Sequence, residues 1–304
     1  MSMNKMFKKV LAVVAAGAMT MGMAMPTFAA DPGKTTEAWI TKTYNTEAGK
    51  AEKFSFTAEQ VKTGTGIITT DAAVTMPEIS FTDTETGKTS RRGKITFPTY
   101  PEAGKYEYTV KEIQTADPAV VNGDHEKMIM SGAEYTMDVY VTDGATGTEI
   151  SNIVVNKVKD DAGQTETGKV DIGNTDTNTF NFTNTYVQEA GTGTDPTDNK
   201  FGSLNVSKKI VNANGTTTTP DDEFAFTATF AFPDGTDANT LGGIKAANGD
   251  TVTSVEGGTY TFKLKANENM KFTGVPVGTT ITVKESAAKN YKGSAEITIN
   301  GTKL

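Results

Sequence analysis

Apolar residues recur at every second position in short runs along most of the chain, and no sustained helical period is present. Such alternation is typical of half-buried β-strands, and the runs are separated by turn-forming Gly, Asn, Asp and Thr. The predicted strands are 39–44, 54–58, 94–97, 106–112, 135–141, 153–158 and 180–186, then 203–210, 224–230, 260–264, 279–285 and 295–299. The pattern therefore predicts an all-β protein with two series of strands, each forming an antiparallel β-sandwich.

The two series repeat each other. FSFTA at 54–58 matches FAFTA at 224–228, and YTVKE at 108–112 matches ITVKE at 281–285. Both pairs are offset by roughly 170 residues, which indicates two copies of one domain rather than a short-repeat solenoid. Residues 188–202, between the copies, have the Gly, Thr and Asp content of a linker. We therefore predict a first domain at 30–187 and a second domain at 203–304.

The first 29 residues follow a different pattern. Three lysines precede an apolar stretch at residues 10–25, then PTFAA follows, and the first acidic residue is Asp31. This is the pattern of a secretory signal peptide, and we predict cleavage after Ala29, with Ala30 as the near alternative. The apolar stretch is too short and weak for a good membrane span, so no membrane partner is expected after cleavage.

Composition narrows the classes of function. The net charge of −8 becomes −11 when the three lysines of the leader are removed, which argues against nucleic acid and anionic membranes as partners. The chain has no cysteine and one histidine, so cysteine-based triads and multi-histidine metal sites are unavailable. We expect no cofactor, no metal and no conventional enzyme. The run DIGNTDTN at 171–178 lacks a defined calcium-loop pattern and is interpreted as a polar turn.

Five predicted strands carry one polar residue on an otherwise apolar face. These residues are Lys42, Glu112 and Asn184 in the first domain, and Lys208 and Glu285 in the second. For any one of them the alternative is a strand end that reaches the surface. Burial of such groups without partners costs several kcal/mol, so the recurrence predicts that Lys, Glu and Asn meet inside the domain.

Their meeting suggests a chemical reaction. Burial lowers the pKa of a lysine, which gives a neutral nucleophilic amine, and raises the pKa of a glutamate, which gives a protonated acid able to polarise a carboxamide. The amine attacks the asparagine carbonyl, glutamate transfers the proton, and ammonia leaves. An isopeptide bond remains, and the reaction occurs once in each domain without turnover.

An [ILV]-x-K strand, a central YTVKE strand and a terminal F-x-N-x-Y strand together resemble the streptococcal-type pilin isopeptide-linkage domain, a CnaB-like, immunoglobulin-like sandwich of Gram-positive surface proteins. The resemblance implies that Lys42 and Asn184 form the bond with Glu112 as the catalytic acid. In the second domain it implies Lys208 for the bond and Glu285 for catalysis. It also implies a secreted shaft subunit of a covalent cell-surface pilus, in which a sortase joins the C-terminal sorting motif of one subunit to a lysine of the next.

Three lysines before the terminal strand of the first domain are candidates for that intermolecular linkage: Lys157, Lys159 and Lys169. Lys169 is favoured because the sequence places it in an exposed, Gly-flanked loop that another protein's active site can reach. The alternative is an ordinary solvated lysine.

The sequence departs from the pattern of the resembled domains toward Leu304. The printed chain has no LPxTG-like motif, and the second domain has no F-x-N-x-Y strand. By the repeat offset, the partner asparagine of the second domain falls roughly 50 residues further on. We interpret the second domain as incomplete, its last strand missing through truncation of the sequence. The alternative is a strand donated by a neighbouring chain.

Two classes of function follow. The first is a structural pilus subunit, whose partners are other pilin subunits joined through a sortase. The second is a cell-wall-attached adhesin, which uses the isopeptide domains as a stalk and binds host surface ligands elsewhere. A sorting motif and polymer ladders on gels favour the first, whereas a further large ligand domain favours the second.

Overall fold

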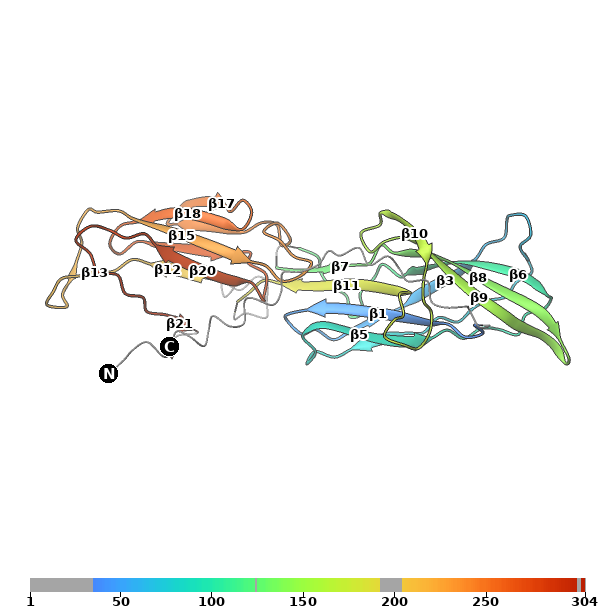
Figure 1. Cartoon of the computed structure of the whole chain (residues 1–304). Coiled ribbons are helices and arrows are strands. Elements are labelled where there is room, and N and C mark those ends of the chain that lie inside the picture. The colour runs from blue at the N-terminus through green and yellow to red at the C-terminus, as the bar shows by residue number, and fades with distance from the viewer. Residues whose placement is uncertain (1–34, 124, 192–203, 300–301, 304) are drawn as a thin grey trace. The chain divides into compact units, whose positions relative to one another are not determined.

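A computed structural model describes residues 35–123, 125–191, 204–299 and 302–303. The predicted signal peptide and most of the predicted linker lie outside the described residues. The described residues form strands, turns and irregular segments, with no helix among them. The all-β prediction is therefore confirmed, and each of the two series of strands forms its own sandwich (Figure 1).

The first domain contains eleven strands. In chain order they are β1 (Trp39–Thr46), β2 (Glu52–Phe54), β3 (Phe56–Gln60), β4 (Ile79–Phe81), β5 (Gly87–Lys94), β6 (Gly104–Glu112), β7 (Glu126–Ile129), β8 (Glu134–Gly144), β9 (Gly147–Lys159), β10 (Thr165–Lys169) and β11 (Asn181–Gln188). One sheet has the order β5-β1-β11-β7, the facing sheet has the order β10-β9-β8-β6-β3, and β2 pairs with β4.

Alternating large apolar residues explain these two layers. Tyr106, Tyr108 and Val110 of β6 are fully buried, while the residues between them are partly exposed. Tyr135 of β8 packs edge-on against Phe182 of β11, with the ring centroids 5.1 Å apart, and so joins the facing sheets. Aromatic pairs of this geometry stabilise a core by about 0.5–1.5 kcal/mol beyond the area that they bury.

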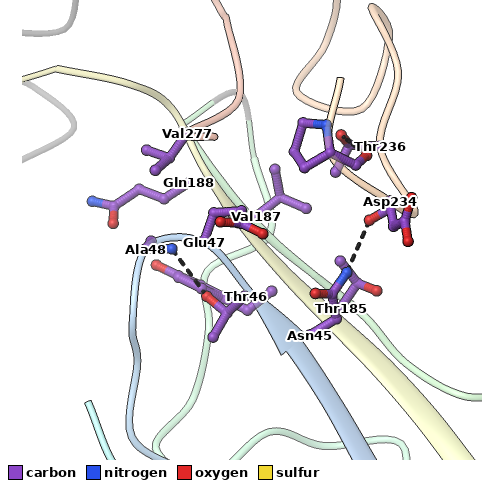
Figure 2. A pocket seen from close by; sticks show the side chains of 12 residues that line it. Asn45, Thr46, Glu47, Ala48, Thr185, Val187, Gln188, Asp234, Thr236 and Val277 are labelled. Atoms are coloured by element: carbon purple, nitrogen blue, oxygen red, sulfur yellow. Dashed lines mark hydrogen bonds between the residues drawn. The ribbon is translucent and has the colours of Figure 1, made fainter. Parts of the chain in front are cut away.

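The first and last strands of this domain lie side by side. β1 pairs in parallel with β11, which places Lys42 opposite Phe182 and Tyr44 opposite Asn184 (Figure 1). Every other strand pair among the described residues is antiparallel. β1 ends at Thr46, whose hydroxyl accepts a hydrogen bond from the backbone N–H of Ala48 at 3.3 Å (Figure 2).

The second domain has a separate core. Its strands are β12 (Leu204–Ser207), β13 (Ile210–Val211), β14 (Thr217–Thr218), β15 (Phe224–Ala231), β16 (Lys245–Asn248), β17 (Thr251–Ser254), β18 (Thr259–Leu264), β19 (Asn269–Thr273), β20 (Thr280–Glu285), β21 (Thr298–Ile299) and β22 (Thr302–Lys303). Sheets of order β12-β19-β16-β17 and β18-β15-β20 enclose a core that includes Phe226, Phe230 and Phe272.

Several predicted strands need correction. The polar strand β5 ends at Lys94, where a strand over 94–97 was predicted; residues 95–97 contribute only an isolated bridge, Thr75 to Thr96. The predicted strand 54–58 is divided between β2 and β3. The predicted strand 203–210 is divided between β12 and β13, and Lys208 lies in the gap. Strong alternation identified the central strands, whereas polar edge strands carried too little apolar signal.

Candidate functional site

The first domain brings together the three polar residues that the sequence placed on apolar faces. Lys42 lies on β1, Asn184 on the neighbouring β11, and Glu112 at the end of β6 in the facing sheet. Lys42 and Asn184 are 0% exposed and Glu112 is 3% exposed. The three side chains therefore meet between the two layers, as the sequence predicted.

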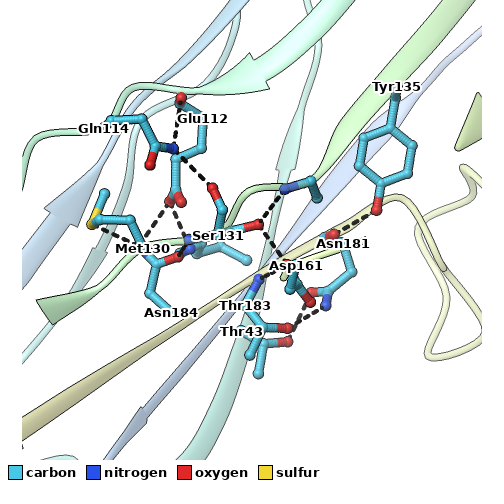
Figure 3. A network of polar contacts seen from close by, with 12 residues as sticks. Thr43, Glu112, Gln114, Met130, Ser131, Tyr135, Asp161, Asn181, Thr183 and Asn184 are labelled. Atoms are coloured by element: carbon cyan, nitrogen blue, oxygen red, sulfur yellow. Dashed lines mark hydrogen bonds and ion pairs between the residues drawn. The ribbon is translucent and has the colours of Figure 1, made fainter. Parts of the chain in front are cut away.

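Both nitrogens converge on one oxygen atom. Lys42 Nζ lies 2.6 Å from Glu112 Oε1. The two atoms form an ion pair, but the geometry of their contact is not that of a hydrogen bond. Asn184 Nδ2 donates a hydrogen bond to the same oxygen at 3.1 Å (Figure 3). Glu112 Oε2 has no hydrogen-bond partner among the described residues. Glu112 Oε1 is thus placed to pass a proton between the amine and the amide nitrogen.

Apolar surroundings shift the proton affinities of this pair. Lys42 Nζ lies 4.3 Å from the centroid of the Phe54 ring, and Met130 Sδ lies 3.3 Å from Asn184 Nδ2. Burial lowers the pKa of Lys42 to about 8, although the nearby Glu112 opposes that shift. Burial likewise raises the pKa of Glu112 against the opposing effect of Lys42. A less basic lysine and a more basic carboxylate favour transfer of a proton between them.

The carbonyl oxygen of Asn184 is bound by the main chain and not by Glu112. Its Oδ1 accepts a hydrogen bond of 2.7 Å from the backbone N–H of Ser131 (Figure 3). A backbone N–H can only donate, so this contact fixes which end of the carboxamide is oxygen. Glu112 therefore contacts the carboxamide through its nitrogen, and the main chain of Ser131 contacts it through its oxygen.

The corresponding pair in the second domain is less enclosed. Lys208 and Glu285 form an ion pair, and Lys208 Nζ lies 4.1 Å from the centroid of the Phe224 ring. Their side chains are 14% and 26% exposed, so the expectation of a core position like that of Lys42 is wrong here. No asparagine among the described residues hydrogen-bonds to either side chain. The second domain therefore contains the lysine and the glutamate of the repeat, without an asparagine bound to them among the described residues.

The structure corrects the setting of Lys169. It is not in a loop but is the last residue of β10, an exposed strand at the edge of its sheet. Lys157 pairs with Glu166 at 3.3 Å, and Lys159 pairs with Glu134 at 3.1 Å. Among the described residues, Lys169 is the one of the three lysines without an ion-pair partner. Its exposure is confirmed, although its predicted backbone setting was wrong.

Sequence reasoning missed Ser131 and the residues that hold it. Ser131 acts on Asn184 through its backbone N–H, a group that every residue except proline possesses, so its identity gave no signal. The acidic residue that contacts it, Asp161, is exposed and resembles many other surface acids in the sequence. Across the described ranges, no group of three His, Cys, Asp or Glu side chains is arranged to hold a metal ion. The same ranges contain no helix long and apolar enough to cross a membrane.

Comparison with known proteins agrees with this site. Residues 38–187 match the family described as the Spy0128-like isopeptide containing domain, and residues 202–303 match a domain of unknown function, DUF7601. The first domain therefore belongs to the family of Spy0128-like isopeptide containing domains. A comparison with curated proteins found no match.

Several solved structures of major pilins from Streptococcus pyogenes are similar to the chain. The major pilin T3.2 of serotype GAS13637 has 22% identity, 85% coverage of each chain and a TM-score of 0.37. The major pilin T-13 of serotype GAS131465 has 20% identity, 86% coverage of each chain and a TM-score of 0.38. A further major pilin has 21% identity, 83% coverage of each chain and a TM-score of 0.39.

Proposed function

We propose that the protein is a structural shaft subunit of a covalently assembled cell-surface pilus, stabilised by an isopeptide bond that it makes within itself. One observation carries the proposal: Lys42, Glu112 and Asn184 meet, buried, inside a Spy0128-like domain. The bond would join two neighbouring strands at the opposite ends of the domain's sequence. An adhesin stalk would use the same bond, so assembly by a sortase is the property that separates the two functions.

The geometry supports a defined course for the reaction. The neutral amine of Lys42 attacks Cγ of Asn184, so an Nζ–Cγ bond forms and the carbonyl electrons move to Oδ1. Glu112 Oε1 takes a proton from Nζ and returns it to Nδ2, the second nitrogen that it contacts. The Cγ–Nδ2 bond then breaks and ammonia leaves. No oxidant, cofactor or external proton is consumed, and the protein reacts once.

The rate of bond formation should rise with pH. Attack requires the neutral amine, and two charged groups, Glu112 and Asp161, favour the protonated form of Lys42 against burial. With a Lys42 pKa of about 8, the rate should fall about tenfold for each pH unit below 8 and level off above it. The measurement is the loss of ammonia by intact mass after protein dissolved from inclusion bodies is diluted into buffers of different pH. A rate that falls above pH 8 would mean that protonated Glu112 is the active form.

Linkage between subunits is proposed at Lys169. This lysine ends an exposed edge strand and has no competing ion pair among the described residues. In cells that contain the matching sortase, Lys169→Ala should abolish the ladder of high-mass polymers while the secreted monomer remains. Lys159→Ala is the matched control, because Lys159 is engaged with Glu134. Ladders that persist in Lys169→Ala and vanish in Lys159→Ala would reassign the linkage, and no ladder from the unaltered full-length protein would favour the adhesin.

The second domain is proposed to hold two of the three residues of another such site. Lys208 and Glu285 would correspond to Lys42 and Glu112, with the acceptor asparagine supplied from outside the described residues. The greater exposure of this pair supports the idea that a further strand covers it.

A further inference from the structure

The chain passes over Asn184 where it crosses from one sheet to the other. β7 ends at Ile129 beside β11, and β8 begins at Glu134 in the facing sheet, so the segment of residues 130–133 connects the layers. Ser131, in this segment, is 1% exposed. Its backbone N–H lies 2.7 Å from Asn184 Oδ1, whereas Glu112 contacts Asn184 Nδ2. The main chain of Ser131 also acts on Glu112 and opposes the rise of its pKa that burial causes.

This N–H lies where negative charge develops during the reaction. Attack by an amine turns the carbonyl oxygen into an oxyanion, and a fixed hydrogen-bond donor in a water-free site stabilises that charge strongly. In enzymes, loss of one such donor slows the reaction by about 10²–10³-fold. Glu112 cannot supply this donor, because it contacts the amide nitrogen instead.

Asp161 binds both the segment of residues 130–133 and the strand β11 that carries Asn184. Its Oδ1 accepts a hydrogen bond from the hydroxyl of Ser131 at 2.5 Å and another from the backbone N–H of Thr183 at 2.8 Å (Figure 3). Thr183 is the residue before Asn184 on β11. The backbone oxygen of Asp161 also accepts a bond from the N–H of Gly132 at 2.8 Å. One residue therefore ties the crossing segment to the strand that carries the acceptor.

Close packing at Gly132 also fixes the position of the crossing segment. A Cβ at Gly132 would lie 2.9 Å from the backbone nitrogen of Gly163 and 3.0 Å from its Cα. Backbone atoms cannot move aside as the end of a flexible side chain can, so any larger residue at 132 would push the crossing segment away from the turn at 160–163. Gly132 thus permits the close approach that places the neighbouring Ser131.

We propose that the Ser131 backbone N–H is the oxyanion donor of the cross-linking reaction, and that Asp161 is a positioning residue that holds this donor against Asn184. The inference rests on the proposed function, because it concerns the same reaction. Ser131 gives up no proton: its N–H binds Oδ1 while the charge is present and releases it when the carbonyl reforms and ammonia leaves.

The test uses the chain of residues 30–304, dissolved from inclusion bodies and diluted to start folding. Intact mass follows the loss of ammonia across a range of pH, and fluorescence of Trp39, the single tryptophan, follows folding separately. Asp161→Ala should lower the alkaline plateau rate about tenfold, less than loss of a donor, because the N–H is loosened rather than removed. Asp161→Asn should recover most of the rate, since an amide Oδ1 can accept both hydrogen bonds.

Matched variants separate the effect of Asp161 on the position of the Ser131 N–H from the effect of its charge on Lys42. Gly132→Ala should lower the plateau without altering any charge, and Glu166→Ala, which removes an exposed acid on the adjacent β10, should leave the rate unchanged. The charge of Asp161 also favours protonated Lys42. A profile of Asp161→Ala that only moves to lower pH, with the same plateau, would therefore assign Asp161 to charge alone and overturn the inference.

The plateau rates and the loss of ammonia by the wild type also decide between the proposals. Equal plateau rates for the wild type and Asp161→Ala, or an Asp161→Asn variant as slow as Asp161→Ala, would overturn the inference and leave the proposed function intact. No loss of ammonia from the wild type would overturn both. If Asp161→Ala does not fold, Ser131→Ala decides by the same rate criterion. It keeps the Ser131 N–H but removes the hydroxyl, and with it the bond to Asp161 and the bond accepted from the Ala133 N–H, both of which hold the crossing segment.

Discussion

Purified protein of residues 30–304 should weigh one ammonia less than its sequence requires. Lys42 and Asn184 converge on Glu112 Oε1, so folding places the amine, the carboxamide and the proton carrier together. Such proximity replaces a sluggish reaction between separate molecules by one within a single molecule, with effective concentrations of about 10⁵–10⁸ M in favourable cases. Trypsin should release a branched peptide that joins the segment around Lys42 to the segment around Asn184.

Three variants test this mass assignment. Asn184→Ala removes the acceptor carbonyl, and Glu112→Gln keeps the shape of the side chain but takes away its capacity to accept a proton, so both should have the full sequence mass. Lys208→Ala should still lose one ammonia, because the second domain shows no acceptor among its described residues. Loss of two ammonias from the unaltered chain would reveal a second acceptor, and full mass for that chain would refute the isopeptide assignment.

Glu112→Gln should melt about 10–20 °C below the unaltered protein. A bond between Lys42 and Asn184 closes a loop of roughly 140 residues, which on the chain-entropy account stabilises by about 5 kcal/mol. For a domain of this size, each kcal/mol corresponds to about 2–4 °C in Tm. Calorimetry of the first domain's transition in the full chain measures the difference.

A second variant separates the bond from the ion pair. Glu112→Gln also removes the carboxylate beside Lys42, whereas Asn184→Ala keeps Lys42 and Glu112 in contact. Both variants lack the bond, so both should show a large fall in Tm. A fall in Glu112→Gln alone would attribute the stability to the ion pair, and unchanged melting of both would contradict the bond.

The interior of the fold was accessible from the sequence because large apolar residues there alternate strictly. Tyr106, Tyr108 and Val110 all point inward, so the register of β6 also predicted that Glu112 is buried. The strand β5, GKTSRRGK, was missed because an edge position requires no apolar face. Pattern alone could not reveal this strand, whose pairing depends on the backbone of β1.

The residues of the site were predictable from the sequence, but the orientation of their groups was not. Its three side chains could be identified because a charged or amide group on an apolar face needs a partner. The orientation of the Asn184 carboxamide could not, because it depends on the main chain of Ser131 and on the turn that contains Asp161. The partly exposed pair of Lys208 and Glu285 shows the limit of a repeat argument, because the same motif is less covered in the second domain than in the first.

The parallel pairing of β1 with β11 has a consequence for a chain that is pulled at its two ends, as in a stalk. Such a pull on the first domain would shear these strands along each other, because the chain enters through β1 and leaves through β11. With the proposed bond in place, load would pass directly from Lys42 to Asn184. The roughly 140 residues between them, about 500 Å of chain at full extension, would be excluded from the load path. In a fibre linked through Lys169, load would instead enter at the end of β10 and leave through β11, and the bond would keep the remainder of the fold attached to that short path.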